Sequence, residues 1–229
     1  MNEEATYAGD ARVDLSEISR AAAKLDVLAA RVVRWAAPVR FGAARTLAEL
    51  DAVYRMQYRV VIERGWGRAA DFPDGLERDA FDDRAIRIIG QDGNRIVASN
   101  RIVLPSPGQP LPTEKGFGLE IEPRGHIADW SRTIVTHKYS NSSHRVLAGL
   151  VAQSWIETRR QGFSNVCGIF SQGILRLYCR LGLHFSVLSS PRRYWNEERV
   201  AVLLNLRESA QAQSMRWAVG YPKSNRSSD

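Results

Sequence analysis

The first regular pattern along the chain is amphipathic. Apolar residues recur every three or four positions between Leu15 and Ala36, and four basic residues lie between them: Arg20, Lys24, Arg31 and Arg34. This spacing predicts one helix, which Pro38 ends. We expect its apolar face to pack on the rest of the protein or on a partner subunit; docking of its basic face on a membrane surface is the alternative.

Beyond this helix, apolar runs alternate with helical patterns. The runs predict strands at residues 39–43, 85–89, 95–104, 127–136, 165–170, 185–189 and 200–206. Helical spacing predicts helices at residues 46–64, 144–160 and 174–181. The first of these opens with a capping box, Thr46 and Glu49, and the polar residues 139–143 supply an N-cap for the second. This order indicates an α/β (α+β) fold, with a mixed sheet that carries helices on both faces.

The remaining segments set the expected boundaries. Residues 105–118 hold four prolines and three glycines, so we expect a loop, either a flap over a substrate or a tolerated insertion. We divide the chain into an N-terminal amphipathic helical extension (1–38), one body (39–207) and a polar C-terminal tail (208–229).

Composition narrows the class of protein. The chain has 229 residues, of which 44% are hydrophobic and 25% charged, so it can bury the core of one domain and is not disordered as a whole. Its formal net charge of +7 predicts an acidic partner or surface. Nucleic acid, anionic lipid, a phosphorylated cofactor and an acidic carrier protein all satisfy that charge.

Cysteine and histidine usage points away from disulfides and metal. Cys167 and Cys179 are too few for a disulfide framework or a zinc site, and the four histidines show no ligand spacing. No apolar stretch reaches the roughly 20 residues of a membrane span. We therefore expect a cytoplasmic protein with no metal, no permanently bound cofactor and no transmembrane segment.

Several motifs carry a family resemblance. The segment from Ile174 to Phe185, with Tyr178 and Gly182, resembles the late helix and following strand of the GNAT acyltransferase superfamily. Upstream, residues 77–82, Arg101 and residues 129–132 resemble in order and spacing the motifs of acyl-homoserine-lactone (autoinducer) synthases and N-acyl amino acid synthases. The run from Leu111 to Phe117 favours the second family. The likeness covers about residues 40 to 206 and implies a GNAT-like, centrally splayed sheet.

The chain also departs from these families at three places. Asp129 stands where autoinducer synthases usually have Glu, and Gln57 stands where an Arg is expected, which weakens recognition of S-adenosylmethionine. The stretch from Lys138 to Arg145 lacks the glycines that let backbone N–H groups approach the pyrophosphate of CoA. A carrier-protein phosphopantetheine therefore suits the chain better than CoA as the acyl donor.

The resemblance also implies roles for individual residues. The catalytic candidates are Asp129, which would bind or deprotonate the amine, its neighbour Arg132, and Tyr178, which would protonate the departing thiolate. An oxyanion would meet backbone N–H groups near residues 134–136. The substrate-binding candidates are Trp66, Asp79, Asp82, Arg101 and Glu114. The acyl-tunnel candidates are Phe117 and Ser171, and the carrier-binding candidates are Lys138, Arg145, Arg176 and Arg180.

Most of these assignments have a purely structural alternative. For Asp129 and Arg132 it is a simple ion pair, for Tyr178 a place in the core, and for Arg101 a role in holding the acidic segment that contains Asp79 and Asp82. Packing and capping are the alternatives for Phe117 and Ser171.

The resemblance implies an N-acyltransferase. It would move a fatty acyl group from an acyl carrier protein, or from acyl-CoA, to the α-amine of an amino acid. The alternative is an acyl-homoserine-lactone synthase that uses S-adenosylmethionine. An ordinary acetyl-CoA enzyme ranks next, and a nucleic-acid-binding module ranks low because the basic residues are dispersed.

Overall fold

A computed structural model describes residues 15–140 and 144–218. In this part of the chain, eight strands form one sheet: β1 (Arg40–Ala43), β2 (Ala85–Asp92), β3 (Arg95–Val103), β4 (Ile127–Val135), β5 (Asn165–Ser171), β6 (Phe185–Val187), β7 (Arg192–Tyr194) and β8 (Glu197–Leu204). The order across the sheet is β1-β2-β3-β4-β5-β8-β6, and β7 pairs with β8. Neighbouring strands are antiparallel except β4 and β5, which are parallel.

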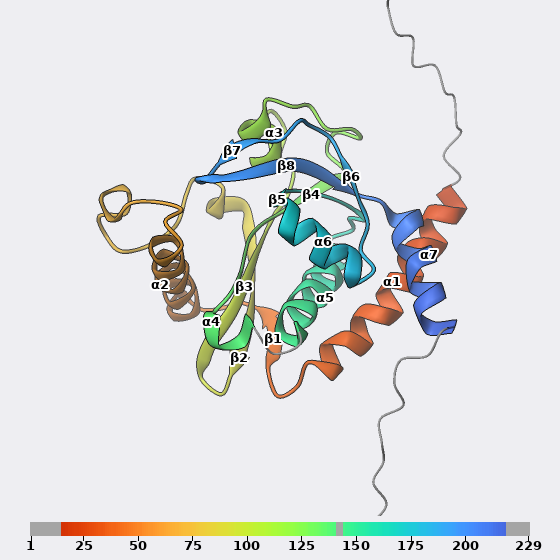
Figure 1. The fold of residues 1–229 in the computed structure, drawn as a ribbon, viewed down its shortest axis with the longest axis horizontal. Helices are drawn as coiled ribbons and strands as arrows, with labels where there is room; N and C mark the ends of the chain where they lie inside the picture. The colour runs from red at the N-terminus through yellow and green to blue at the C-terminus, as the bar shows by residue number, and fades with distance from the viewer. Residues whose placement is uncertain (1–14, 141–143, 219–229) are drawn as a thin grey trace, which may run out of the picture.

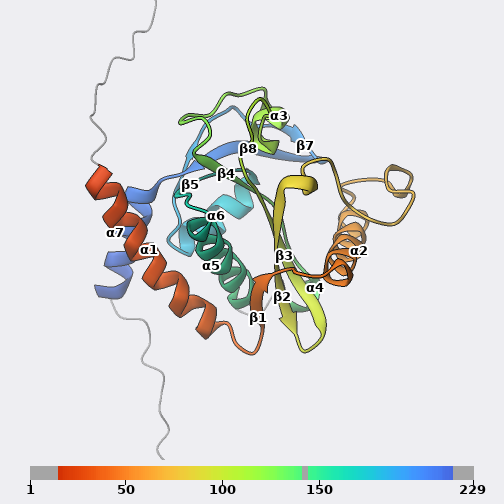
Figure 2. The same ribbon diagram turned by 180° about the vertical axis from the view of Figure 1, so that it is seen from behind.

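Helices cover both faces of this sheet (Figures 1 and 2). One face shares its core with α1 (Leu15–Trp35), α5 (Arg145–Arg160), α6 (Gln172–Arg180) and α7 (Leu206–Ala218). The other face carries α2 (Leu47–Glu63), and α3 (Pro112–Phe117) contacts β4 and β5. Consecutive residues of β3 contact helices on opposite faces of the sheet. Ser99 accepts a hydrogen bond from Gln57 of α2, and Asn100 donates one to Ser154 of α5. The expected mixed sheet with helices on both faces is confirmed.

The strongest sequence patterns give the elements that they predict. Helix α1 buries Ala22, Leu25 and Ala29 against the sheet core, so its apolar face packs on the rest of the protein. Both hydrogen bonds of the capping box at Thr46 form, and α2 begins at the next residue. None of the described helices combines the length and apolar character that a membrane crossing requires.

Three segments differ from the expectation. The expected loop 105–118 contains the short helix α3, because the Glu114 carboxylate accepts hydrogen bonds from the backbone N–H groups of Leu111 and Ile121. Strand β7 was not predicted. The expected polar tail forms helix α7 up to Ala218, and residues 219–229 lie outside the described part of the chain.

The N-terminus of α5 also differs from the expected one. A short helix, α4 (His137–Ser140), precedes it. His144 occupies the N-cap position of α5 and makes no side-chain capping bond, whereas the expected capping residues 141–143 lie outside the described residues.

The centre of the sheet splays apart. Strands β4 and β5 pair only over residues 127–130 and 165–168; beyond Trp130 and Gly168, β4 continues along β3 and β5 continues along β8. Gly168 permits the close approach at the last paired position, because a Cβ there would lie 2.8 Å from the Trp130 carbonyl oxygen. Arg132 follows with a positive φ of 55°, where the register between β3 and β4 shifts. An opening therefore begins directly after the last paired residues.

Candidate active site

A cavity of about 330 Å³ occupies the splay between β4 and β5. Residues 131–135 of β4 form one wall and residues 169–171 of β5 form the other. Helices α2, α4, α5 and α6, the residues after α2 and the β7–β8 hairpin complete the lining. Of the residues expected from the sequence, Trp66, Arg132 and Ser171 lie on this cavity.

The cavity has a polar, aromatic end and an apolar end. The first is lined by Arg64, Trp66, Arg132, Trp195, Glu197 and Arg199. The second is lined by Leu147, Phe170, Ile174 and Leu177, which belong to α5, β5 and α6. The apolar lining residues Val60, Ile134 and Ile169 lie on the side of α2 and α3. Such a space fits an amphiphilic molecule, with a charged group at one end and a hydrocarbon chain at the other.

The β7–β8 hairpin closes the polar end. Its turn residues Trp195 and Asn196 have positive φ angles of 52° and 56°. The Asn196 side-chain amide donates to the Gly65 carbonyl at 2.8 Å, and the Trp66 indole N–H donates to Glu197 Oε1 at 2.8 Å. These two hydrogen bonds join the hairpin to the residues that follow α2. Neither contact was predicted, because each joins segments about 130 residues apart.

Arginine guanidinium groups lie over the indole rings at this end. The Arg132 guanidinium lies 3.9 Å from the ring centre of Trp195, and the Arg199 guanidinium lies 5.0 Å from that of Trp66. Arg199 also donates to Glu197 Oε2 at 3.0 Å. Arg64, Arg132 and Arg199 thus line this end together with the Glu197 carboxylate, the only carboxylate among the lining residues that the structure describes.

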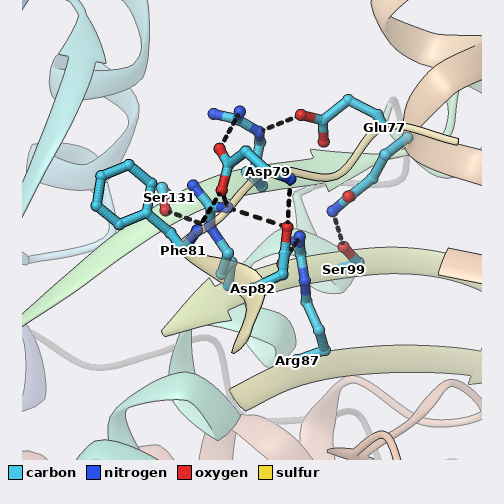
Figure 3. Close-up of polar contacts among 10 residues, drawn as sticks. Glu77, Asp79, Phe81, Asp82, Arg87, Ser99 and Ser131 are labelled. Atoms are coloured by element: carbon cyan, nitrogen blue, oxygen red, sulfur yellow. Dashed lines mark hydrogen bonds and ion pairs between the residues drawn. The ribbon is translucent and has the colours of Figure 1, made fainter. Parts of the chain in front are cut away.

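Arg132 is held by an ion-pair network that includes Glu77, Asp79 and Asp82 (Figure 3). Arg132 Nε donates to Glu77 Oε1 at 2.8 Å, and Arg132 Nη2 donates to Asp79 Oδ2 at 3.0 Å. Arg101 Nη1 donates to Asp79 Oδ1 at 2.6 Å and to Asp82 Oδ2 at 3.3 Å. Arg101 thus holds the acidic segment in place, which is the structural alternative that the sequence left open.

The same network connects to the cavity wall and fixes the charge of Asp79. Arg101 Nε donates to the hydroxyl of Ser131, a cavity residue, at 3.0 Å. Burial favours the neutral form of Asp79, but Arg101 and Arg132 outweigh it and lower the pKa of this carboxyl below its usual value. Asp79 is therefore ionised at neutral pH and fixes both arginines.

Tyr178 is buried next to the apolar end of the cavity, and the described lining does not include it. Its ring packs edge-on against Phe170, which lines the cavity, with ring centres 5.1 Å apart. Its hydroxyl has no partner within hydrogen-bond geometry among the described residues. The nearby Thr133 side chain lowers the pKa of Tyr178, but less than burial raises it. Burial is the larger effect and raises the pKa of Tyr178 to about 12. The hydroxyl therefore keeps its proton at neutral pH.

The structure corrects the expected pairing of Asp129 with Arg132. Asp129 is fully buried, and its Oδ2 accepts hydrogen bonds from the Thr113 backbone N–H at 2.8 Å and from the Thr113 hydroxyl at 2.5 Å. The described cavity lining does not include Asp129. Its carboxylate instead joins β4 to α3, and Arg132 pairs with Glu77 and Asp79.

Two further candidates surround α3 rather than the described cavity. Glu114 caps this helix, as given above, and both of its oxygens accept backbone N–H groups. The buried ring of Phe117 packs against Tyr194 and has the Arg192 guanidinium 3.9 Å from its centre. Neither residue is part of the described lining, whereas Ser171, the other tunnel candidate, is.

The expected carrier-binding residues divide into two groups. Lys138, Arg176 and Arg180 are exposed on α4 and α6. Arg145 instead stacks on Trp35 and donates to the backbone carbonyls of Trp35 and Ala37, so it ties α5 to the end of α1. Among the described residues, no group of three or more His, Cys, Asp or Glu side chains is arranged to hold a metal ion.

Solved structures match this chain, although no protein-family model and no curated protein does. A CoA-dependent acyl-homoserine lactone synthase, BjaI, with SAM and isopentyl-CoA, shares 21% identity over 76% of this chain and 83% of its own, with a TM-score of 0.56. FeeM, an N-acyl amino acid synthase from uncultured soil microbes, shares 17% identity over 78% and 98%, with a TM-score of 0.61. A putative N-acetyltransferase from Lactobacillus plantarum shares 15% identity over 72% and 96%, with a TM-score of 0.51. The chain therefore shares its fold with an acyl-homoserine lactone synthase, an N-acyl amino acid synthase and a putative N-acetyltransferase. This is the GNAT-like fold that its motifs indicate.

Proposed function

We propose that the protein is an N-acyltransferase that moves a fatty acyl group from a thioester to the α-amine of an amino acid. The observation that carries this proposal is the cavity in the splay of the sheet, with a cationic, aromatic end and an apolar end. An N-acyl amino acid has this same division, with a carboxylate beside the amide and a hydrocarbon chain beyond it. The shared fold with acyl-transferring proteins supports the same class of reaction.

The acceptor amino acid would bind at the polar end. Its carboxylate would face the Arg132 and Arg199 guanidinium groups, which can donate two parallel hydrogen bonds. Its ammonium would face Glu197, which we assign as the group that receives the amine proton directly or through water. Glu197 replaces Asp129 in this role because Glu197 lines the cavity.

The chemistry then needs stabilisation of an oxyanion and a proton for the leaving thiolate. The amine nitrogen attacks the thioester carbonyl carbon, and the C–S bond of the tetrahedral intermediate breaks. Backbone N–H groups of Ile134 and Val135, where β4 no longer pairs with β5, are the candidate donors to the oxyanion. The Thr136 N–H is not, because it donates to the Val97 carbonyl at 2.9 Å. Tyr178 is the candidate donor of a proton to the thiolate sulfur, because its hydroxyl is protonated and lacks a full hydrogen-bond partner in the described structure.

An acyl carrier protein is the proposed donor. The exposed cations Lys138, Arg176 and Arg180 lie on α4 and α6, whose residues Tyr139, Ile174 and Leu177 line the cavity. An acidic carrier docked on them would deliver its phosphopantetheine arm to the apolar end. Acyl-CoA is the alternative donor.

Mass analysis of reaction products tests this function. The purified protein is incubated with acyl carrier thioester or acyl-CoA and with an amino-acid mixture or S-adenosylmethionine. We expect N-acyl amino acids, and we expect Glu197→Gln to lose most of the activity while the exposed-residue control Arg160→Gln keeps it. Formation of an acyl-homoserine lactone from S-adenosylmethionine would replace this proposal with the lactone synthase. Absence of acyl transfer from either donor would reject both.

A further inference from the structure

The outer face of α1 is a basic stripe that the proposed reaction does not use. At 100° per residue, six side chains of α1 fall within an arc of about 100° on the solvent side. They are Arg20, Lys24, Val27, Arg31, Arg34 and Trp35, and all are exposed. The buried residues Ala22, Leu25 and Ala29 lie on the opposite side, so the packing of α1 leaves the stripe uncovered by the described chain.

The two acids of α1, Glu17 and Asp26, lie outside the stripe and pair with groups of other helices. Glu17 pairs with Arg207 of α7 at 3.0 Å. Asp26 accepts hydrogen bonds from the Trp155 indole at 2.7 Å and from Arg159 at 3.3 Å, both on α5. The stripe itself holds four basic residues and no acidic one, along a helix about 30 Å long.

Two apolar side chains lie among these charges. Val27 is 64% exposed in the middle of the stripe and Trp35 is 44% exposed at its end. Tryptophan favours the interface between water and lipid, and clustered lysine and arginine side chains on a helix are attracted to anionic headgroups.

A basic groove runs beside the stripe. This hollow of about 380 Å³ lies between α1 and α7, which pack side by side at one edge of the molecule (Figures 1 and 2). It is lined by Glu17, Arg20, Ala21, Lys24, Arg207, Ala210 and Gln211, with three cations and one acid. Its charge and size suit a phosphate headgroup.

We infer that α1, with the groove beside it, docks the protein on an anionic phospholipid bilayer. The cations would lie at the level of the headgroups, and Val27 and Trp35 would enter the interface. An extended, straight row of cations with exposed apolar side chains fits a flat lipid surface better than the compact footprint of an acidic carrier. The inference does not depend on the proposed reaction.

Vesicle co-sedimentation of the full chain tests the inference. We expect the protein to pellet with vesicles of phosphatidylglycerol and phosphatidylcholine, to stay in solution with phosphatidylcholine alone, and to be released by added salt. Lys24→Gln/Arg31→Gln removes two stripe cations and should weaken binding about thirtyfold, at about fivefold per cation. Val27→Asp, at a position 64% exposed, should weaken it without unfolding the protein.

The matched control removes two exposed cations elsewhere. Arg55→Gln/Arg59→Gln changes the net charge equally on α2, on the other side of the sheet, and should leave vesicle binding unchanged. Wild-type protein that ignores phosphatidylglycerol vesicles, or equal losses in both double variants, would overturn the inference. So would an α1 variant that binds vesicles normally and has lost binding to acyl carrier protein, since the stripe would then be the carrier surface. Circular dichroism confirms that each variant is folded.

Discussion

At the scale of single residues, Tyr178 shows how burial shapes a candidate acid. Its ring belongs to the sheet core, yet its hydroxyl is left without a full hydrogen-bond partner in the described structure. An unpaired buried hydroxyl costs about 1–3 kcal/mol. A core role alone gives no reason to keep this oxygen in place of a phenylalanine ring.

Tyr178→Phe separates catalysis from packing. We expect a slower turnover, with unchanged KM for the acceptor and a melting temperature at least as high as that of the wild type, because an unpaired hydroxyl is removed. Steady-state kinetics and thermal unfolding measure the two effects. An unchanged turnover would show that Tyr178 has only a structural role in the core.

The same variant has a predicted signature at high pH. The pKa of Tyr178 rises from about 10 in the unfolded chain to about 12 in the folded one, so its contribution to stability is complete below pH 10 and is lost between pH 10 and 12. The difference of two units corresponds to about 3 kcal/mol. Tyr178→Phe should therefore unfold at higher pH than the wild type in an alkaline titration followed by circular dichroism.

Trp195 is the residue whose role the sequence did not indicate. It lies at a hairpin turn with positive φ, and its ring stacks on the Arg132 guanidinium, whose Nε and Nη2 are fixed by carboxylates. The stacking fixes the plane of the guanidinium, so we regard Trp195 as a positioning residue for the acceptor carboxylate.

Substitution of Trp195 should act on one substrate. We expect Trp195→Ala to raise KM for the amino acid on the order of tenfold, since one stacking contact of about 1 kcal/mol or more is lost, and to leave KM for the acyl donor unchanged. Trp195→Phe keeps an aromatic face and should restore most of the affinity. Equal changes in both KM values, or no rescue by phenylalanine, would contradict the role.

At the scale of elements, α3 shows what a sequence pattern misses. Its prolines and glycines indicate a loop, but Glu114 caps its first turn and Asp129 fastens it to β4 through Thr113. One oxygen of the carboxylate that a family motif marks as catalytic, Oδ2, thus holds an element, whereas Oδ1 has no hydrogen-bond partner among the described residues.

Two substitutions of Asp129 test this interpretation. Asp129→Asn retains an amide oxygen that can accept both Thr113 hydrogen bonds, so we expect a folded and largely active protein. Asp129→Ala leaves the Thr113 donors unpaired and should cost about 1–3 kcal/mol of stability, measured by chemical denaturation. A folded but inactive Asn variant would instead assign the carboxylate to the chemistry.

The elements that the sequence predicts are those with a local signal. Large apolar residues at helical spacing mark α1, and the capping box marks the start of α2. Helix α7 has no such signal in residues 206–212, the part whose side-chain burial is described, because the buried residues after Leu206 there are the small Ser209 and Ala210. Strand β7 is only three residues long and leads into a turn with a tryptophan at positive φ, which few turn rules anticipate.

The candidate site is predictable to a similar extent. Motif resemblance finds Trp66, Asp79, Arg101 and Arg132, which the fold brings to one cavity or to the network behind it. Glu197 and Arg199 could not be found in this way, because their position depends on long-range pairing of the last strands with β5. The hydrogen bonds of Asp129 depend in turn on Thr113 in α3, a helix that the prolines and glycines of residues 105–118 do not predict.

At the scale of the whole molecule, the two ends of the chain join the central body. Helices α1 and α7 belong to the same core as the sheet, so the expected extension and tail contribute to its packing. Ser209 donates and accepts at the backbone of His184, which links α7 to the segment before β6.

Truncation after Asn205 tests this contribution. We expect a lower melting temperature, because the deletion exposes the α1 surface that Leu206 and Ala210 cover and removes the Ser209 contacts. Arg207→Ala is the control: its pair with Glu17 is about half exposed and contributes less than about 1 kcal/mol. A truncated protein as stable as the wild type would show that α7 is dispensable for folding.

The close contact at Gly168 has a consequence for substrate length. Since this glycine lets β5 approach β4 up to Trp130, it sets the point at which the two strands begin to part. In the proposed acyl transfer, the distance from that point to the reacting carbonyl would limit the space for the acyl chain. The longest chain that the enzyme accepts would then depend on the absence of a Cβ atom at this one position.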